Sequence, residues 1–285
     1  MLVDPSRTTH HPSRLHGPRR IVCLTEEPTE TLYALGEQER IVGISGFTVR
    51  PAEARRDKPK VSAFTSAKVD RILALKPDMV IGFSDIQADI AAELIRAGID
   101  VWIANHRSVD GILDYIRRLG ALVGAAHKAT EYADRLQRGL EDIAARASQG
   151  TVRPRVYFEE WDEPRISGIQ WVAELIRIAG GDDIFPELAA ESLAKQRILP
   201  NDDEIIRRDP QIVIGSWCGK RFRPEKVAAR EGWADVSAVR DAQLFEVKSP
   251  LILQPGPAAL TDGVAALSSI IAAWQKTIGV GLPAQ

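Results

Sequence analysis

Two cysteines and almost no net charge limit what this 285-residue chain can be. Cys23 and Cys218 lie far apart in the sequence, and the formal net charge is −2. A single pair of cysteines argues against a disulfide-based fold, although the sequence alone still allows one disulfide between them. A nearly neutral chain offers no basic surface for nucleic acid or for an anionic membrane. We therefore expect neither partner, and a monomer that binds a small molecule.

Long apolar runs are missing as well. No stretch reaches the roughly 18 apolar residues that cross a membrane, and the segment before Ile21 lacks the apolar centre of an export signal. As written, the sequence predicts a cytoplasmic protein, and a truncated or misassigned start would instead allow a periplasmic one. His10, His11 and His16 suggest a metal site, but prolines interrupt this segment. We expect residues 1–18 to be a disordered tail without a metal.

Motifs of common enzymes are also lacking. There is no Gly-rich phosphate loop, no nucleophile elbow and no histidine pair at zinc-binding spacing. Cys218 has Lys220 beside it, but no His or Asn partner for a catalytic thiolate is identifiable nearby in the sequence. The acidic cluster EEWDE, Glu159 to Glu163, could supply the acid and base of a glycosidase, although alternation along a strand lets at most half of these acids share a face. We expect no enzyme and no catalytic residue, with a hydrolase using Glu159 to Asp162 as the alternative.

What the sequence does contain is an internal repeat. DRILALKPDMVIGF, from Asp70, and DEIIRRDPQIVIGS, from Asp203, align without a gap at a constant offset of 133 residues. They share Asp, Ile, Pro and the whole of Val-Ile-Gly. A second pair, RIVCL from Arg20 and RVYFE from Arg155, has an offset of 135 residues. An offset of about one domain length predicts two similar lobes.

Short apolar runs alternate with helical patterns after Arg20. In the first half we predict strands at IVCL, RIVGIS, Met79 to Phe83 and VWIA, and helices over about 29–35, 69–75 and 87–97. Such alternation is typical of α/β folds with parallel sheets, whose ligands bind beyond the carboxyl ends of the strands.

A Pro-free stretch separates the two halves. Between Asn105 and Val152 there is no proline, and Tyr132, Leu136, Leu140 and Ile143 recur at helical spacing. We predict one long helix over 125–150 between an N-terminal lobe, 19–124, and a C-terminal lobe, 151–285. Because a helical linker resists large hinge motion, the lobes should close only modestly on a ligand.

Polar and aromatic residues follow the predicted strands. These segments are Thr25–Glu27, Phe83–Asp85, Asn105–His106, Glu160–Asp162 and Trp217–Lys220. Because strand ends meet at one edge of a parallel sheet, we expect them to line a shared cleft. Trp161 and Trp217 would suit a large flat ligand, and core packing is the alternative for both. His106 could meet the ligand or be a hydrogen-bonded loop residue.

This order of elements resembles the helical-backbone class (class III) of periplasmic-binding-protein-like substrate-binding proteins, which serve ABC importers of cobalamin and iron–siderophore complexes. The resemblance covers Pro18 to Trp274. It is carried by PRRIVCLTEEPTETLYALGEQERIVGIS, DRILALKPDMVIGF, the interlobe helix, ISGIQWVAELIRIAGGDDIF and DEIIRRDPQIVIG. EEWDEP and GSWCGK are most similar to the cobalamin-binding branch. The resemblance implies two Rossmann-like lobes that hold a corrinoid between them without transforming it, or, as the alternative, an iron-siderophore or haem receptor.

The resemblance also implies a ligand site. The family's aromatic contacts correspond to Phe64, Phe83, Trp161 and Trp217. Arg50 stands before Pro51, where cobalamin binders often have an aromatic residue. Gln254 lies in SPLILQPGP, which in the family closes the cleft from the second lobe, and Glu160 joins the site from the strand-end set.

Docking on an ABC permease uses one acidic residue per lobe in this family, normally Glu. Alignment of this chain places Asp89 and Asp203 at those positions, and each is one methylene shorter. The resemblance therefore implies an ABC permease as a partner, whereas a cytoplasmic relative would bind the same ligand without one.

Overall fold

The computed structural model describes residues 17–63, 66–150 and 152–280, with no side chains described for 278–280. The first half of the chain folds around a parallel five-stranded sheet with the order β3-β2-β1-β4-β5. Its strands are β1 Ile21–Cys23, β2 Ile41–Ser45, β3 Lys60–Ser62, β4 Met79–Phe83 and β5 Asp100–Ala104. The helices are α1 Glu26–Ala34, α2 Ala52–Asp57, α3 Val69–Ala74, α4 Ala88–Arg96 and α5 Val109–Leu122, with 3-10 turns η1 Gln38–Arg40 and η2 Asp85–Gln87.

The second half builds a second sheet with the order β10-β9-β6-β7, with β8 also paired to β6. Its strands are β6 Arg155–Asp162, β7 Arg165–Ser167, β8 Asp182–Asp183, β9 Ile212–Gly215 and β10 Leu244–Glu246. Only β7 is antiparallel to its neighbour. The helical segments are α7 Gln170–Ile178, α8 Pro186–Ala189, η3 Ala194–Arg197, α9 Asp203–Arg208, α10 Pro224–Ala228, α11 Ser237–Arg240, α12 Ser249–Ile252, the π-helical turn η4 Ala259–Gly263 and α13 Val264–Val280.

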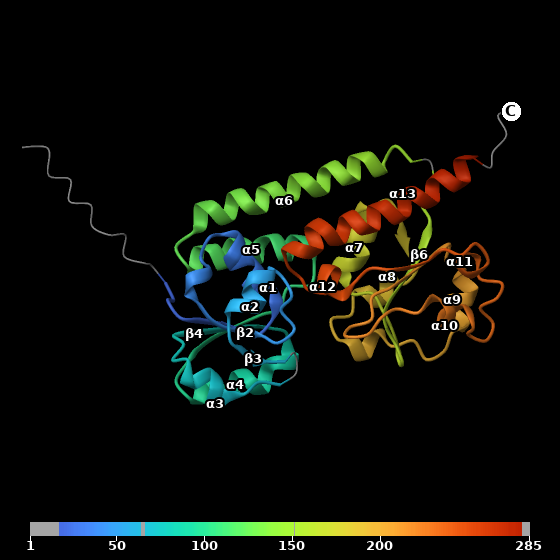
Figure 1. Ribbon diagram of the computed structural model, residues 1–285. Helices are drawn as coiled ribbons and strands as arrows, with labels where there is room; N and C mark the ends of the chain where they lie inside the picture. Colours follow the sequence, from blue (N-terminus) through green and yellow to red (C-terminus); the bar gives the residue numbers. More distant parts are fainter. Residues whose placement is uncertain (1–16, 64–65, 151, 281–285) are drawn as a thin grey trace, which may run out of the picture.

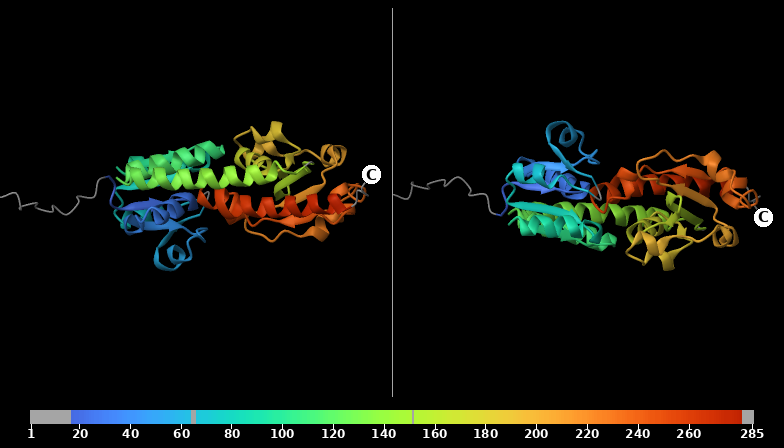
Figure 2. Two further views of the ribbon diagram at one scale, coloured as in Figure 1. Left: turned by 90° about the horizontal axis from the view of Figure 1, so that it is seen from above. Right: turned by 90° about the horizontal axis from the view of Figure 1, so that it is seen from below.

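One long helix, α6 Ala126–Ala147, runs along both lobes (Figure 1). The C-terminal α13 lies beside it in both sets of views (Figures 1 and 2). A single apolar cluster extends from β1 and α5 through α6 to β6, α7 and α13, and includes Ile21, Leu136, Phe158 and Leu267. The predicted architecture of two similar α/β lobes joined by a long helix is therefore confirmed.

The internal repeat corresponds to equivalent pairs of strands. β1 pairs with β4 through Val22 and Val80, and β6 pairs with β9 through Tyr157 and Val213. Both offsets seen in the sequence thus describe one register, repeated in each lobe. The repeated glycine, next to last in β4 and last in β9, is explained by packing. A Cβ on Gly82 would lie 2.3 Å from Oε1 of Gln87, and one on Gly215 would lie 1.9 Å from the Phe222 ring.

Several details differ from the sequence predictions. Helix α1 begins at Glu26, three residues before the predicted start, because Pro28 is accommodated in a first turn that also carries two acidic side chains. Cys23 is buried, Cys218 is exposed, and both are free thiols. None of the described helices is long and apolar enough to span a bilayer. The predicted tail lies, up to residue 16, outside the described residues, together with its three histidines.

Candidate ligand site

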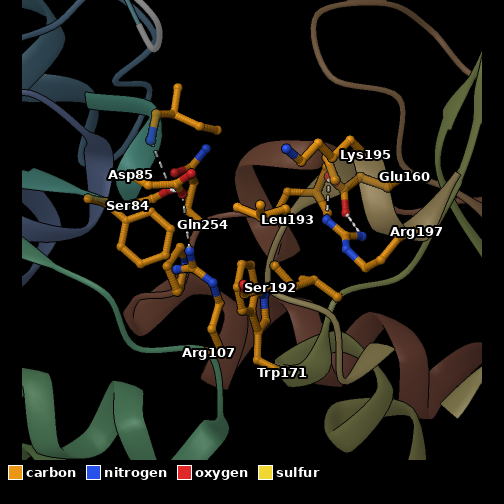
Figure 3. Close-up of a pocket in the computed structure, with 16 residues that line it drawn as sticks. Ser84, Asp85, Arg107, Glu160, Trp171, Ser192, Leu193, Lys195, Arg197 and Gln254 are labelled. Carbon is orange, nitrogen blue, oxygen red and sulfur yellow. Dashed lines mark hydrogen bonds and ion pairs between the residues drawn. The ribbon is translucent and has the colours of Figure 1, made fainter. Parts of the chain in front are cut away.

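A cavity of about 330 Å³ lies between the lobes, where strands from both sheets end. Figure 3 shows its lining, with Ser84, Asp85 and Arg107 on the N-terminal side and Glu160, Lys195 and Arg197 opposite. The remaining residues that line it are Phe83, Ile86, Ile169, Trp171, Ser192, Leu193, Ala194, Leu253, Gln254 and Pro255. Polar and charged side chains from strand ends of both sheets thus line one site.

The N-terminal wall is an aromatic stack capped by a guanidinium. Phe83 is the last residue of β4, and its ring is 5% exposed and meets His106 edge-on at 5.2 Å. His106 in turn stacks on Tyr115 at 4.6 Å. The guanidinium of Arg107 lies 4.7 Å above the Phe83 ring, which is a favourable cation–π distance.

The C-terminal wall rests on a buried ion pair. Nη1 of Arg197 donates to Oε2 of Glu160 at 2.6 Å and also to the Ser167 carbonyl, while Nη2 lies 3.3 Å from Oε1 of Glu160. The Arg197 side chain is 2% exposed, so this pair holds the turn after Leu193 against β6 and β7. Trp171, from the first turn of α7, donates its indole N–H to the Ile252 carbonyl at 2.8 Å.

The lobes are joined beside the cavity by polar contacts. Nε2 of His106 donates to the Pro255 carbonyl at 2.8 Å, and burial lowers the pKa of His106 to about 4. The ring is therefore neutral at physiological pH. Farther out, Arg50 reaches both Glu30 of α1, at 3.1 Å, and Asp262 of η4, at 2.7 Å. These contacts place the second lobe's 253–255 segment against the first lobe's strand ends.

Three of the predicted ligand residues line the cavity, namely Phe83, Glu160 and Gln254. Trp161 and Trp217 do not. Trp217 is 4% exposed and packs edge-on against Phe222 at 5.0 Å. This agrees with core packing, the alternative to ligand contact for this residue. Trp161 is half-buried, donates its indole N–H to the Glu163 carbonyl at 2.8 Å and has the Lys220 ammonium 4.2 Å from its ring.

Two other predicted ligand residues lie elsewhere. Arg50 spans the lobes through its ion pairs and does not line the cavity. Phe64 lies outside the described residues. Contact of Phe83, Glu160 and Gln254 with a ligand stays a prediction, as does any contact made by Phe64, Arg50 or the two tryptophans.

The predicted cleft residues Glu26 and Glu27 are buried at the junction of the lobes and are not part of the cavity lining. A Cβ on Gly256 of the second lobe would meet Cβ of Glu27 at 2.7 Å. Burial raises the pKa of Glu26 to about 7 and that of Glu27 to about 8. Glu27 accepts a hydrogen bond from the Thr25 hydroxyl at 2.6 Å.

The hydrolase alternative lacks a working acid–base pair. Glu159 is fully buried, and both of its oxygens accept hydrogen bonds at 2.8 Å from Arg230, with Trp217 and Tyr157 as further donors. Asp162 forms an ion pair with Lys220. A carboxylate that is held by a guanidinium and shielded from solvent can neither attack nor relay a proton to a substrate. Glu159 and Asp162 are thus engaged in ion pairs within the protein.

The sequence prediction missed several cavity residues, among them four with charged or aromatic side chains: Arg107, Trp171, Lys195 and Arg197. Arg107 follows β5 and lies one residue beyond the predicted strand-end set. Lys195 and Arg197 belong to the turn η3, which no strand precedes, and Trp171 lies in a helix whose apolar face resembles any core face. Of these four, only Arg107 would have been found by extending the strand-end segments by one residue.

The two acids expected at a permease are exposed in the first turns of short helices, Asp89 in α4 and Asp203 in α9. They are not equivalent in the two lobes. The repeat aligns Asp203 with Asp70, which is exposed in the first turn of α3 directly before β4. Within the described ranges, no three His, Cys, Asp or Glu side chains gather as a metal site would require.

Residues 21–251 match the family described as periplasmic binding protein. The chain belongs to this family. It is 26% identical over 267 residues to an uncharacterised ABC transporter substrate-binding lipoprotein, YvrC, of Bacillus subtilis, covering 89% of this chain and 80% of the relative. It is 23% identical over 249 residues to the vitamin B12-binding protein of Vibrio parahaemolyticus, covering 85% of each. As a family member, the chain is a substrate-binding protein of the ABC-transporter type.

Solved structures of the family share the bilobed fold. The periplasmic vitamin B12-binding protein BtuF of Vibrio cholerae superimposes with a TM-score of 0.74 at 20% identity, covering 92% of this chain and 99% of that one. The periplasmic heme-binding protein RhuT of Roseiflexus superimposes with a TM-score of 0.76 at 22% identity, covering 90% of this chain and 100% of that one. Fold similarity at this identity therefore leaves the ligand open.

Proposed function

We propose that this substrate-binding protein holds cobalamin or a related corrinoid between its lobes and does not transform it. The observation that carries the proposal is the match over most of the chain to relatives named for vitamin B12 binding, combined with a cavity at the strand ends of both lobes. Apolar side chains, among them Ile86, Leu193 and Leu253, line this cavity and suit the apolar part of a macrocycle.

The size of the cavity limits how a corrinoid would sit. About 330 Å³ is at the lower end for small-molecule sites, and a corrinoid is larger. In this proposal one edge of the macrocycle, with its amide or carboxylate side chains, enters the cavity, and the rest lies outside it. Ile86, which is 45% exposed and lines the cavity, would contact the outer part.

A titration tests this proposal. Cyanocobalamin added to the purified protein should shift its visible absorption bands and give a saturable calorimetric isotherm with one site per chain. Bound ligand that is released by denaturation should be chemically unchanged. Absence of both signals with protein that unfolds cooperatively would contradict corrinoid binding.

The second candidate is a haem or ferric-siderophore receptor. Positive charge in the cavity favours it, because Arg107 and Lys195 are suited to the carboxylates or anionic oxygens of such chelates. Titration of haemin and of a ferric hydroxamate under the same conditions discriminates between the candidates, because each chelate has its own visible spectrum.

Delivery to a permease through Asp89 and Asp203 remains a prediction, and so does the expected cytoplasmic location. Fractionation of cells that express the native gene tests the location. Recovery from the periplasm would contradict it and favour a role in import.

A further inference from the structure

Arg107 is a largely buried cation whose hydrogen-bond and ion-pair partners are weak. Its side chain is 13% exposed, and the nearest carboxylate oxygen, Oδ1 of Asp85, is 3.9 Å from Nη2. Nη1 donates only to the carbonyl of the preceding His106, at 3.3 Å. Nε is buried and has no hydrogen-bond partner among the described residues. The guanidinium thus has donor capacity that the protein leaves unused.

The other cavity arginine, Arg197, has much stronger partners, although its Nε is also buried without a hydrogen-bond partner among the described residues. Arg197 makes a two-pronged ion pair with Glu160 and also donates to a backbone carbonyl. For Arg107 the one ion-pair partner is Asp85, whose side chain is 56% exposed, so water screens that pair; its other contacts are the Phe83 ring and the His106 carbonyl. Burial lowers the pKa of Arg107, as expected when a charge is desolvated without a close counter-ion.

We propose that Arg107 binds an anionic group of the ligand, a carboxylate or a phosphate, and that Asp85 is the counter-ion which this group displaces. This inference rests on the proposed function, because it places a chelate in the cavity. Figure 3 shows Arg107 reaching toward Asp85 from the N-terminal side, with Lys195 on the opposite side. Lys195 has no ion pair within the described parts of the chain and adds a second positive charge to the same cavity.

Asp85 then determines selectivity. A neutral ligand leaves the Arg107–Asp85 pair in place and gains nothing from the guanidinium. An anionic ligand competes with Asp85 for Arg107, and a bidentate charged contact is stronger than a screened pair at 3.9 Å. Loss of Asp85 and loss of Arg107 should therefore have opposite effects on the same ligand, which no purely structural role of either residue would produce.

Two corrinoids of similar shape and different charge distinguish the effect of the anionic group from that of the macrocycle. Cobyric acid carries one free carboxylate, and in cobinamide that carboxylate is an amide. Arg107→Gln should weaken binding of cobyric acid by about 10- to 100-fold, the usual effect of losing a charged hydrogen bond. Arg107→Lys should keep part of the affinity, and Asp85→Asn should strengthen cobyric acid binding by about two- to fivefold. Affinity for cobinamide should change by less than about twofold in all three.

The chain offers a matched control. Arg118 lies 3.9 Å from Asp114 and 5.6 Å from the Trp102 ring, so it repeats the weak ion pair and the aromatic contact outside the cavity. Arg118→Gln and Asp114→Asn should leave both affinities unchanged. Thermal unfolding of every variant confirms that it is folded, and Asp85 is exposed enough for Asp85→Asn to fold in any case.

Equal loss of both corrinoids in Arg107→Gln, or weaker cobyric acid binding in Asp85→Asn, would overturn the inference. If wild-type protein binds neither corrinoid, the proposed function fails by itself. The same variants are then titrated with haemin and with haemin dimethyl ester, which lacks the free propionates. A preference for haemin that Arg107→Gln abolishes supports the inference, and equal binding of the two haemins overturns it.

Discussion

Carboxylates of the two lobes differ in their partners: Glu159 and Glu160 of β6 in the C-terminal lobe are paired with arginines, whereas the buried Glu27, which follows β1 in the N-terminal lobe, is not. Glu159 and Glu160 of β6 are held by Arg230 and Arg197, with N–O distances down to 2.8 and 2.6 Å. Glu27, in the first turn of α1 after β1, has the Thr25 hydroxyl as a hydrogen-bond donor, and one of its oxygens is buried without a partner in the described chain.

The two lobes therefore use acidic side chains in two ways, as partners of arginines and as an unpaired buried carboxyl group. In the C-terminal lobe both carboxylates are paired with arginines, and the Glu160–Arg197 pair fixes the wall of the cavity. In the N-terminal lobe burial raises the pKa of Glu27 to about 8, so this group carries a proton at neutral pH and forms part of the contact with Gly256. The same substitution, Glu to Gln, should therefore act oppositely in the two lobes.

The largest effect is expected in the C-terminal lobe. Glu159→Gln leaves the Arg230 guanidinium buried without a counter-ion, and breaking such a pair costs about 3–5 kcal/mol. Urea unfolding should show this loss. A free energy of unfolding within about 1 kcal/mol of wild type would mean that the pair is solvated and the contrast between the lobes is wrong.

In the N-terminal lobe the effect depends on pH. The folded-state pKa of Glu27, about 8, is above its unfolded value, so its contribution is complete below the unfolded pKa and is lost as pH rises toward 8. The slope is about 1.4 kcal/mol per pH unit within that window. Glu27→Gln should flatten the profile and be more stable than wild type at pH 8. Glu93→Gln, on the exposed face of α4, is the control and should leave the wild-type profile unchanged.

The repeated glycines, Gly82 and Gly215, allow the packing of the two lobes to be compared at equivalent positions. A methyl group on Gly215 meets the buried Phe222 ring at 1.9 Å, and one on Gly82 meets the end of the more flexible Gln87 side chain at 2.3 Å. Gly215→Ala should destabilise by about 1–3 kcal/mol and Gly82→Ala by less, as thermal unfolding can measure. The reverse order would show that Gln87, whose Oε1 accepts from the Phe83 N–H, is the more rigid neighbour.

The smallest effects concern the exposed acids. Asp70→Ala, Asp89→Ala and Asp203→Ala should each leave stability within about 0.5 kcal/mol. If a permease recognises equivalent positions of the lobes, stimulation of its ATPase should fall in Asp70→Ala and Asp203→Ala and persist in Asp89→Ala. Loss in Asp89→Ala alone would favour the original alignment over the internal repeat.

Most of the fold was predictable because local and repeated patterns agreed. The shared Val-Ile-Gly marks β4 and β9, and their partners β1 and β6 have the same register. The site was less predictable, because its side chains depend on distant partners. Trp217 follows a strand as expected, yet Glu159, 58 residues away, accepts its indole N–H and holds it in the core. Lys195 and Arg197 lie in a turn that has no periodic signal.

The most direct test of the central claim asks whether cyanocobalamin occupies the interlobe cavity. Ser192→Trp adds an indole at an exposed position that lines this cavity, and Ser148→Trp adds one at the exposed end of α6. Calorimetric titration should show binding at least about tenfold weaker for Ser192→Trp, because filling the cavity excludes the ligand edge, and wild-type affinity for Ser148→Trp. Equal affinities for the two variants would contradict the account.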